Sequence, residues 1–427
     1  MKRMRFTILC VIALMVLATL PTAANDIVLQ YWRHGDPNVE GVNQISLDLD
    51  AIKRFEADHP GVKVELVTAP DSPKLMEKVL TAVVGGMAPD VVNITSSDFI
   101  TLADSGVLSP VDPFALGYGS MGDLKEAFLP GSLDGYSYHG KVYGIPFELS
   151  AYGFWINRDH FREAGIDPET NYPKTWSEVA AVGQKLTRQQ IGRISRQGYC
   201  PLTMYGIWGT VGWQAMINQM GSSILSEDQT ESYINSPAAV RGLQMRKDFV
   251  YKYKISDPAV KIDPLELFGT DQASMIDYGG SWAIPILDRD YPDVDYTLVP
   301  YPRWADAKVD TGAITYGYGK VVFTSSKHKE LSWELVKYLH SQPQELIKLG
   351  IFQPVKGWFD TPEAQSFPYF DYWMQELGKG TYHIQSARIN EISNIMMKAQ
   401  DEVLLNNGDV QAELDKAKAE MDKVLSR

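Results

Sequence analysis

Cysteine is scarce in this chain. Its 427 residues include two, Cys10 and Cys200, and Cys10 lies in an apolar leader that we expect to be removed. A mature chain with one cysteine cannot form an intramolecular disulfide. Its stability must then come from a packed core, which a chain of this length can build. We interpret Cys200 as a buried apolar side chain rather than a reactive thiol or a metal ligand.

Long hydrophobic runs are also missing after the leader, where no apolar run approaches the 18 residues typical of a membrane-spanning helix. The leader itself has the parts of a secretory signal peptide. A basic start with Lys2, Arg3 and Arg5 precedes an apolar run over 6–20. We therefore predict a signal peptide over residues 1–24, with an uncleaved membrane anchor as the alternative.

The predicted cleavage site lies before Asn25 and follows the small residues Ala23 and Ala24. Lipid attachment would require a cysteine at this site, but Cys10 lies within the apolar run, so we expect no lipid anchor. An exported protein without an anchor would be lost from a cell with a single membrane. We therefore predict a periplasmic location.

Basic residues are outnumbered, with 40 Lys and Arg against 53 Asp and Glu and a formal net charge of −13. The leader holds three basic residues and no acidic residue, so its removal lowers the net charge to −16. A negative surface disfavours nucleic acids and anionic membranes as partners. It does not by itself indicate a cationic ligand.

Catalytic and metal-binding motifs are absent as well. The chain has no HExxH, no GxSxG and no phosphate-binding loop, and its seven histidines show no ligand spacing. We predict no cofactor, no metal and no enzymatic activity, and we disfavour a metal or anion receptor. Acid pairs of glycosidases have no sequence signature, so a secreted carbohydrate-active enzyme remains the alternative from another class.

The first half of the mature chain does contain an alternation of strands and helices. Strands are predicted over 27–32, 62–67 and 90–94, with helices over 49–58 and 72–84 between them. This order is typical of a parallel α/β sheet. Polar residues follow the strands that end at Trp32 and Ile94, and ligands bind at such strand ends in open α/β sheets.

The stretch over 142–179 contains many breaks and caps within a short length, which indicates that the chain crosses there from one domain to another. It combines a break at 143–146, an apolar strand over 151–156 and a helix capped by Asn157. A second helix follows, for which Thr175 and Glu178 form a predicted capping box. We interpret the stretch as a hinge, and two later breaks, near Pro300 and Gly350, as further crossings.

Six segments stand out in chain order: FEADHPGVKVELV, GGMAPDVVNI, IPFELSAYGFWINRDHFREAGID with PKTWSEV, ASMIDYGGSWAI, DTGAITYGYGKVVF and NNGDVQAELDKAKAEMDKVL. Their order and spacing resemble those of the extracellular solute-binding proteins of bacterial ABC sugar importers, the maltose-binding-protein-like group. Together with the leader, they extend over essentially the whole chain.

The resemblance implies an α/β, periplasmic-binding-protein-like fold, with two α/β lobes joined by three hinge crossings and a ligand cleft between them. The lobes would comprise residues 25–147 with 301–350, and 148–300 with 351–427. It also implies a monomer that captures a carbohydrate by closing its lobes and delivers it to an inner-membrane ABC permease.

A sugar presents hydroxyl groups at its edge and C–H groups on its faces, so its site needs planar polar groups and aromatic rings. Related proteins place such groups at strand ends, at the hinge edge and after a glycine turn. The candidate ligand-binding residues are Trp32, Arg33, Asp36, Ser97, Asp98, Glu148, Tyr152, Trp213, Trp282, Thr311, Gly312, Tyr316 and Trp358.

Structural roles compete with binding at several of these positions. Trp32 and Trp213 could pack in a core, Arg33 and Asp36 could pair with each other, and Ser97 or Asp98 could cap the next helix. Trp282 is our preferred stacking residue because it follows Gly279-Gly280-Ser281.

One departure from the family bears on the ligand. Maltose-binding proteins carry sugar-stacking aromatic residues in a helix near the C-terminus, whereas residues 386–393 of this chain contain none. This argues against maltodextrin. A binder of a polyol or a glycerol phosphate ester is the alternative within the family, and Arg33 keeps it open.

Overall fold

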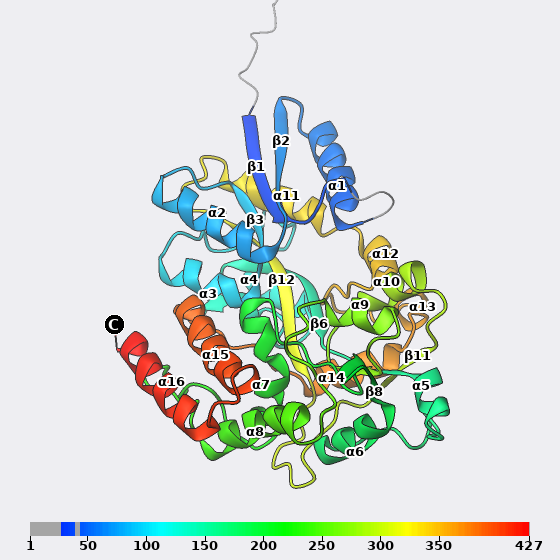
Figure 1. Ribbon diagram of the computed structural model, residues 1–427. Coiled ribbons are helices and arrows are strands. Elements are labelled where there is room, and N and C mark those ends of the chain that lie inside the picture. Colours follow the sequence, from blue (N-terminus) through cyan, green and yellow to red (C-terminus); the bar gives the residue numbers. More distant parts are fainter. Residues whose placement is uncertain (1–26, 39–42, 427) are drawn as a thin grey trace, which may run out of the picture.

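The computed structural model describes residues 27–38 and 43–426 (Figure 1). The predicted signal peptide lies outside these residues. No helix in the described part of the chain is long and apolar enough to cross a membrane. Helices and strands alternate to form two lobes, which confirms the predicted α/β class.

The main sheet belongs mostly to the first lobe. Its strand order is β13-β12-β3-β1-β2, and β6 pairs with the other edge of β12. The strands are β1 (Ile27–His34), β2 (Val62–Ala69), β3 (Val91–Thr95), β6 (Gly144–Ala151), β12 (Ile314–Val322) and β13 (Thr381–Tyr382). β1, β2 and β3 are parallel to one another, and β12 is antiparallel to β3 and β6.

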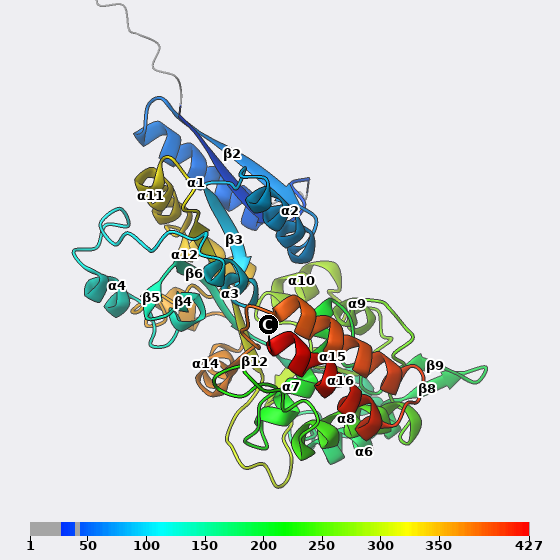
Figure 2. The same cartoon turned by 90° about the vertical axis from the view of Figure 1, so that its left-hand side faces the viewer.

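Both faces of this sheet are covered because successive side chains of a strand point to opposite sides. Tyr31 packs beneath α1 (Gln44–Asp58) and α11 (Lys329–Leu339) on one face. Trp32 packs beneath α2 (Ser72–Val84) and α3 (Ser96–Asp104) on the other. Figure 2 shows these helices on the two sides of the sheet.

The second lobe contains a smaller sheet with the order β10-β7-β11, formed by β7 (Phe154–Asn157), β10 (Met275–Ile276) and β11 (Tyr296–Val299). Phe154 faces one core and Trp155 faces another on the opposite side. Surrounding helices are α5 (Arg158–Glu163), α6 (Trp176–Leu186), α7 (Val211–Asn218), α8 (Pro237–Tyr251), α9 (Pro264–Gly269), α10 (Ala283–Asp290), α14 (Phe370–Lys379), α15 (Ile389–Leu404) and α16 (Val410–Leu425).

Shorter elements complete the described chain. They are α4 (Met121–Ala127), α12 (Pro343–Leu346), α13 (Pro362–Gln365), β4 (Ser137–Tyr138), β5 (Lys141–Val142), β8 (Arg188–Gln190), β9 (Arg193–Arg196) and the 3-10 turns η1 (Asp134–Tyr136), η2 (Gly206–Thr210) and η3 (Ile347–Leu349).

Both predicted helix caps of the hinge stretch are confirmed. The Asn157 side chain accepts a hydrogen bond from the His160 N–H, and Thr175 and Glu178 form a capping box. The predicted break at 143–146 is wrong, because β6 runs from Gly144 through Pro146. A bulge in the β6–β12 ladder adjoins Pro146, at a point where its missing N–H costs little.

The predicted strand over 151–156 is divided in the structure. β6 ends at Ala151 and β7 begins at Phe154. Tyr301, Trp304 and Ile314 pack in the same core as Phe154 of the second lobe. The lobe boundaries given above stay a prediction.

Candidate ligand-binding cleft

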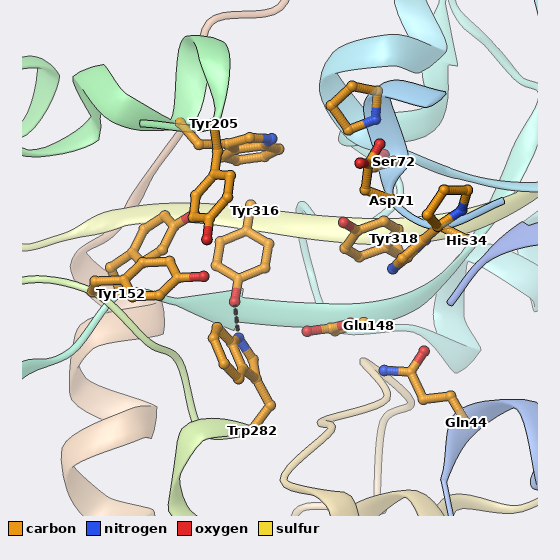
Figure 3. A pocket seen from close by; sticks show the side chains of 14 residues that line it. His34, Gln44, Asp71, Ser72, Glu148, Tyr152, Tyr205, Trp282, Tyr316 and Tyr318 are labelled. Atoms are coloured by element: carbon orange, nitrogen blue, oxygen red, sulfur yellow. Dashed lines mark hydrogen bonds between the residues drawn. The ribbon is translucent and has the colours of Figure 1, made fainter. Parts of the chain in front are cut away.

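A cavity of about 390 Å³ lies where the two lobes meet β6 and β12 (Figure 3). This volume falls within the range of small-ligand sites. Its lining comes from three places: strand and helix ends of the first lobe with the loop before α2, the two crossing strands, and the η2 and α10 regions of the second lobe. The lining residues are His34, Gln44, Pro70, Asp71, Ser72, Pro73, Glu148, Tyr152, Tyr205, Trp208, Tyr278, Trp282, Tyr316 and Tyr318.

Aromatic rings form half of this lining and support one another. The ring centroid of Tyr152 lies 4.9 Å from that of Tyr316 and 6.0 Å from that of Tyr278, to which it is stacked. The Trp208 ring meets Tyr316 edge-on at 5.7 Å. The Trp282 indole N–H donates a hydrogen bond to the Tyr316 hydroxyl. These contacts hold the aromatic side chains of the cavity in place without a ligand.

The crossing strands place these groups by alternation and close approach. Tyr316 and Tyr318 lie two residues apart on β12, so they share a face, and Tyr318 is in register with Glu148 of β6. Gly317 lies between them, and a Cβ there would be 2.4 Å from the Glu148 carbonyl oxygen. A larger residue would therefore separate the strands at the floor of the cleft.

A glycine turn brings in the second-lobe rings. Gly279 has a φ of +98°, and a Cβ at Gly280 would lie 2.3 Å from the Ser150 hydroxyl oxygen. The turn can therefore approach β6 closely and present Tyr278 on one side and Trp282 on the other.

Glu148 is the unpaired acid of the cleft. Its residue is 4% exposed, yet its carboxyl group makes no hydrogen bond or ion pair with any residue in the described part of the chain. Burial raises its pKa to about 7, an effect that the positive charges of Arg33 and Lys320 partly oppose. A buried carboxylate without a partner is costly, and hydroxyl groups of a ligand could satisfy it.

The first-lobe wall supplies further polar groups. The Gln44 amide oxygen accepts a hydrogen bond from Arg33 at 2.7 Å, which leaves its NH2 group to donate. Burial and the Arg33 charge lower the pKa of His34 to about 3, so its ring is neutral. Asp71 caps α2 by accepting from the Lys74 N–H at 2.7 Å.

Among the described residues, no lysine or arginine lines the cavity. Arg33 points under α1, where its guanidinium lies 2.5 Å from the Asp48 carboxylate. The Lys320 ammonium is fully buried next to Phe147 and makes no hydrogen bond. The cavity surface is therefore aromatic, polar and without permanent positive charge.

The structure brings four of the thirteen predicted binding residues together in the cavity: Glu148, Tyr152, Trp282 and Tyr316. Contact with a ligand stays a prediction for all thirteen.

Three predicted residues at the end of the first strand lie elsewhere. Trp32 packs under α2, with the Lys78 ammonium 4.6 Å from its ring centroid. Arg33 is paired with Asp48 as described. Asp36 is exposed and accepts hydrogen bonds from Asn38 at 2.8 and 3.0 Å.

Ser97 and Asp98 also lie outside the cavity lining. The Ser97 hydroxyl is 3.3 Å from His383 Nδ1. Thr95 caps α3 by accepting from the Asp98 N–H, and its hydroxyl donates back to the Asp98 carboxylate at 2.8 Å. Both residues therefore have local structural partners.

The remaining four have structural partners outside the cavity lining. Trp213 is fully buried and donates to the Ala239 carbonyl at 2.8 Å. The Thr311 hydroxyl donates to the Lys379 carbonyl. A Cβ at Gly312 would meet the Glu376 carboxylate. Trp358 packs in an apolar core.

Cys200 is buried, and burial raises the pKa of its thiol.

Sequence reasoning missed several lining residues. Asp71 and Ser72 follow the strand over 62–69, so the rule applied to the other two strand ends would have found them. Tyr318 could have been found by alternation from Tyr316. Tyr205 and Gln44 carry no signal, because only the packing of distant segments brings them to the cleft.

Residues 43–345 match the family model described as "Bacterial extracellular solute-binding protein". A putative binding protein of Brucella abortus (strain 2308) is 24% identical over 394 residues, which cover 88% of this chain and 89% of that protein. The sn-glycerol-3-phosphate-binding periplasmic protein UgpB of Shigella flexneri serotype 5b is 24% identical, covering 82% and 80% of the two chains.

Among solved structures, the ABC substrate-binding protein Lmo0181 of Listeria monocytogenes, in complex with cycloalternan, superposes with a TM-score of 0.78. It is 20% identical, and the match covers 94% of this chain and 99% of the other. This likeness shows that the fold is shared. With the family model matching well over half of its length, this chain belongs to the bacterial extracellular solute-binding proteins.

Proposed function

We propose that the protein binds a neutral carbohydrate in the cleft and delivers it to an inner-membrane ABC permease. The observation that carries this proposal is the unpaired carboxyl group of Glu148, which lines the same cavity as seven aromatic side chains. Aromatic rings cover the C–H faces of a sugar, and a carboxylate accepts firm hydrogen bonds from its hydroxyl groups.

A polyol or a glycerol phosphate ester is the second candidate. The similarity to a glycerol-3-phosphate-binding protein supports it, as does α2, whose N-terminus faces the cavity and would attract an anion. Against it, Asp71 places a carboxylate at that N-terminus, and no Lys or Arg of the described chain lines the cavity. A phosphate group would meet negative charge there, so we favour the neutral sugar.

The lining residues come from both lobes, and this supports binding by closure of the lobes. The ligand would contact both lobes and stabilise the closed form by its differential affinity. We propose that residues 25–147 with 301–350 and residues 148–300 with 351–427 move as two lobes about three crossings. We also propose that the mature protein is a periplasmic monomer, released by cleavage before Asn25, and that it performs no catalysis.

Thermal-shift screening tests the ligand class. Neutral mono- and oligosaccharides, polyols and sn-glycerol 3-phosphate are compared, because a ligand that binds the folded state raises apparent stability. We expect a neutral sugar to raise the melting temperature. A response to the phosphate ester alone would overturn the neutral-sugar proposal, and turnover of a glycan by the purified protein would overturn the non-catalytic one.

A further inference from the structure

A two-stranded hairpin projects from the second lobe. Its strands β8 and β9 pair with each other, with Gln190 opposite Arg193 and the two-residue loop Ile191-Gly192 between them. We call residues 187–197 the arm. Figure 2 shows the arm extending away from the lobe, past α9 and α10.

The residues at the tip of the arm are unfavourable for the backbone conformation of the turn. Ile191 has a φ of +51° and Gly192 a φ of +74°. Two-residue hairpins with both φ values positive favour Asn-Gly, and β-branched residues are disfavoured in this conformation. The Ile191 side chain is also fully exposed, at 103%. No contact within the described molecule compensates for this conformational cost.

The base of the arm, in contrast, is well anchored. Arg188 and Arg196, one on each strand, donate to the two carboxylate oxygens of Glu163 on α5 at 2.9 and 2.6 Å. The side chain of Arg193, next to the tip, makes no hydrogen bond or ion pair with any residue in the described ranges. The arm therefore presents one apolar and one cationic side chain on a fixed support.

The charge of this region is opposite to that of the whole chain. No acidic residue occurs between Glu178 and Glu227, whereas Lys185, Arg188, Arg193 and Arg196 are basic. Glu163 neutralises part of this charge by pairing with Arg188 and Arg196, and the arm retains an excess of positive charge. It complements a partner that carries carboxylates.

We propose that the arm docks the protein onto the outer face of its importer's membrane-spanning subunits. Ile191 enters an apolar socket there, and Arg193 pairs with a carboxylate at the socket's rim. The inference rests on the proposed function, because the importer is the partner to which the ligand must pass.

A protein socket fits the arm better than a lipid surface does. Insertion into a bilayer requires a broad apolar face, and the arm offers one exposed apolar side chain. Anionic headgroups would also repel the acidic remainder of the molecule. A shallow apolar socket, by contrast, can be filled by a single isoleucine at the centre of a small contact.

Site-specific photo-crosslinking in cells that express the importer tests the arm directly. A photoreactive phenylalanine analogue replaces Ile191 or, as a control, Leu405, which is 40% exposed at the end of α15. We expect a crosslink from position 191 to a membrane-spanning subunit of the importer, none from position 405, and a weaker one when Arg193→Glu is added. Crosslinks from 191 to lipid, to another copy of the chain, to an unrelated protein or to nothing would overturn the proposal.

The Ile191→Asn variant provides a second readout. Asparagine suits the turn, so the variant should fold and bind carbohydrate as the parent does, while uptake of that carbohydrate falls by about tenfold. Unchanged uptake would overturn the arm proposal alone. If no carbohydrate raises the melting temperature of the parent protein, the proposed function fails instead, whatever the crosslinks show.

Discussion

The ammonium nitrogen of Lys320 lies 3.4 Å from the ring centroid of Phe147, and both side chains are buried. It has no hydrogen-bond partner in the described part of the chain. Burial lowers its pKa to about 7, while Asp48 and Glu148 partly oppose this shift. A cation held in this way costs free energy of folding.

We expect Lys320→Met to raise the free energy of unfolding by about 1–4 kcal/mol, because an apolar side chain of similar length removes the buried charge. Between pH 7 and about 10.5 the unfolded chain binds more protons at Lys320 than the folded chain does, so wild-type stability gains from this residue as pH rises. The variant should lack this gain. Urea unfolding at several pH values measures both effects.

Lys423→Met is the matched control, because Lys423 is exposed on α16. It should change stability by less than about 0.5 kcal/mol. A Lys320→Met protein that is less stable than the parent would contradict the prediction.

Glu148→Gln should weaken carbohydrate binding by about 1.5–3 kcal/mol at pH 8, the usual contribution of hydrogen bonds to a charged group. Since the pKa of Glu148 is raised to about 7 and hydroxyl groups bind its ionised form, parent affinity should fall as pH decreases below 7. The fall is at most about tenfold per pH unit. Titration calorimetry at pH 5.5 to 8 measures it.

The same raised pKa has an opposite effect on the free protein. Between about pH 4.5 and 7 the folded state binds more protons at Glu148 than the unfolded state, so its contribution to stability declines as pH rises. Glu148→Gln should remove both dependences. Glu65→Gln, on an exposed position of β2, should leave them intact, and a pH-independent parent affinity would count against the role of Glu148.

Trp282→Ala should reduce affinity by about 1–3 kcal/mol, because it removes both a stacking surface and the hydrogen bond to Tyr316. Trp282→Phe should restore part of the loss. Trp333→Phe serves as a control, since Trp333 of α11 is buried in the core of the first lobe and does not belong to the cavity lining. Equal affinities for Trp282→Ala and the parent would place the stacking site elsewhere.

Closure should be visible in solution. A saturating ligand should decrease the radius of gyration measured by X-ray scattering, because the lobes approach each other. It should also alter the intrinsic tryptophan fluorescence, because Trp208 and Trp282 line the cavity. If neither quantity changes, the ligand does not bind by closure.

Local signals in the sequence predicted local structure well. The Asn157 cap and the Thr175–Glu178 capping box involve neighbours in the chain, and both form as expected. Pro146 misled because proline usually interrupts a strand. Only the pairing of β6 with β12, which is 170 residues away in register, creates the bulge that accommodates it.

Part of the candidate site could likewise be predicted from local signals in the sequence. Glu148 and Tyr152 could be selected because a carboxylate and an aromatic residue in a hinge strand are unusual. Arg33 could not be separated from His34, since the choice depends on which face of β1 meets Asp48 of α1. Neighbouring residues of a strand point to opposite faces, so an error of one position assigns a core side chain to the cleft.

The insertion of β12 between β3 and β6 also determines when the first lobe can be completed. β12 pairs with β3 on one edge and β6 on the other, yet it is synthesised about 170 residues after β6. β1, β2 and β3 can pair with one another earlier, but β6 has no strand to pair with, and the sheet stays incomplete, until residue 322 has left the ribosome. Contacts this distant in sequence slow folding, so the first lobe is completed only after most of the chain has been synthesised.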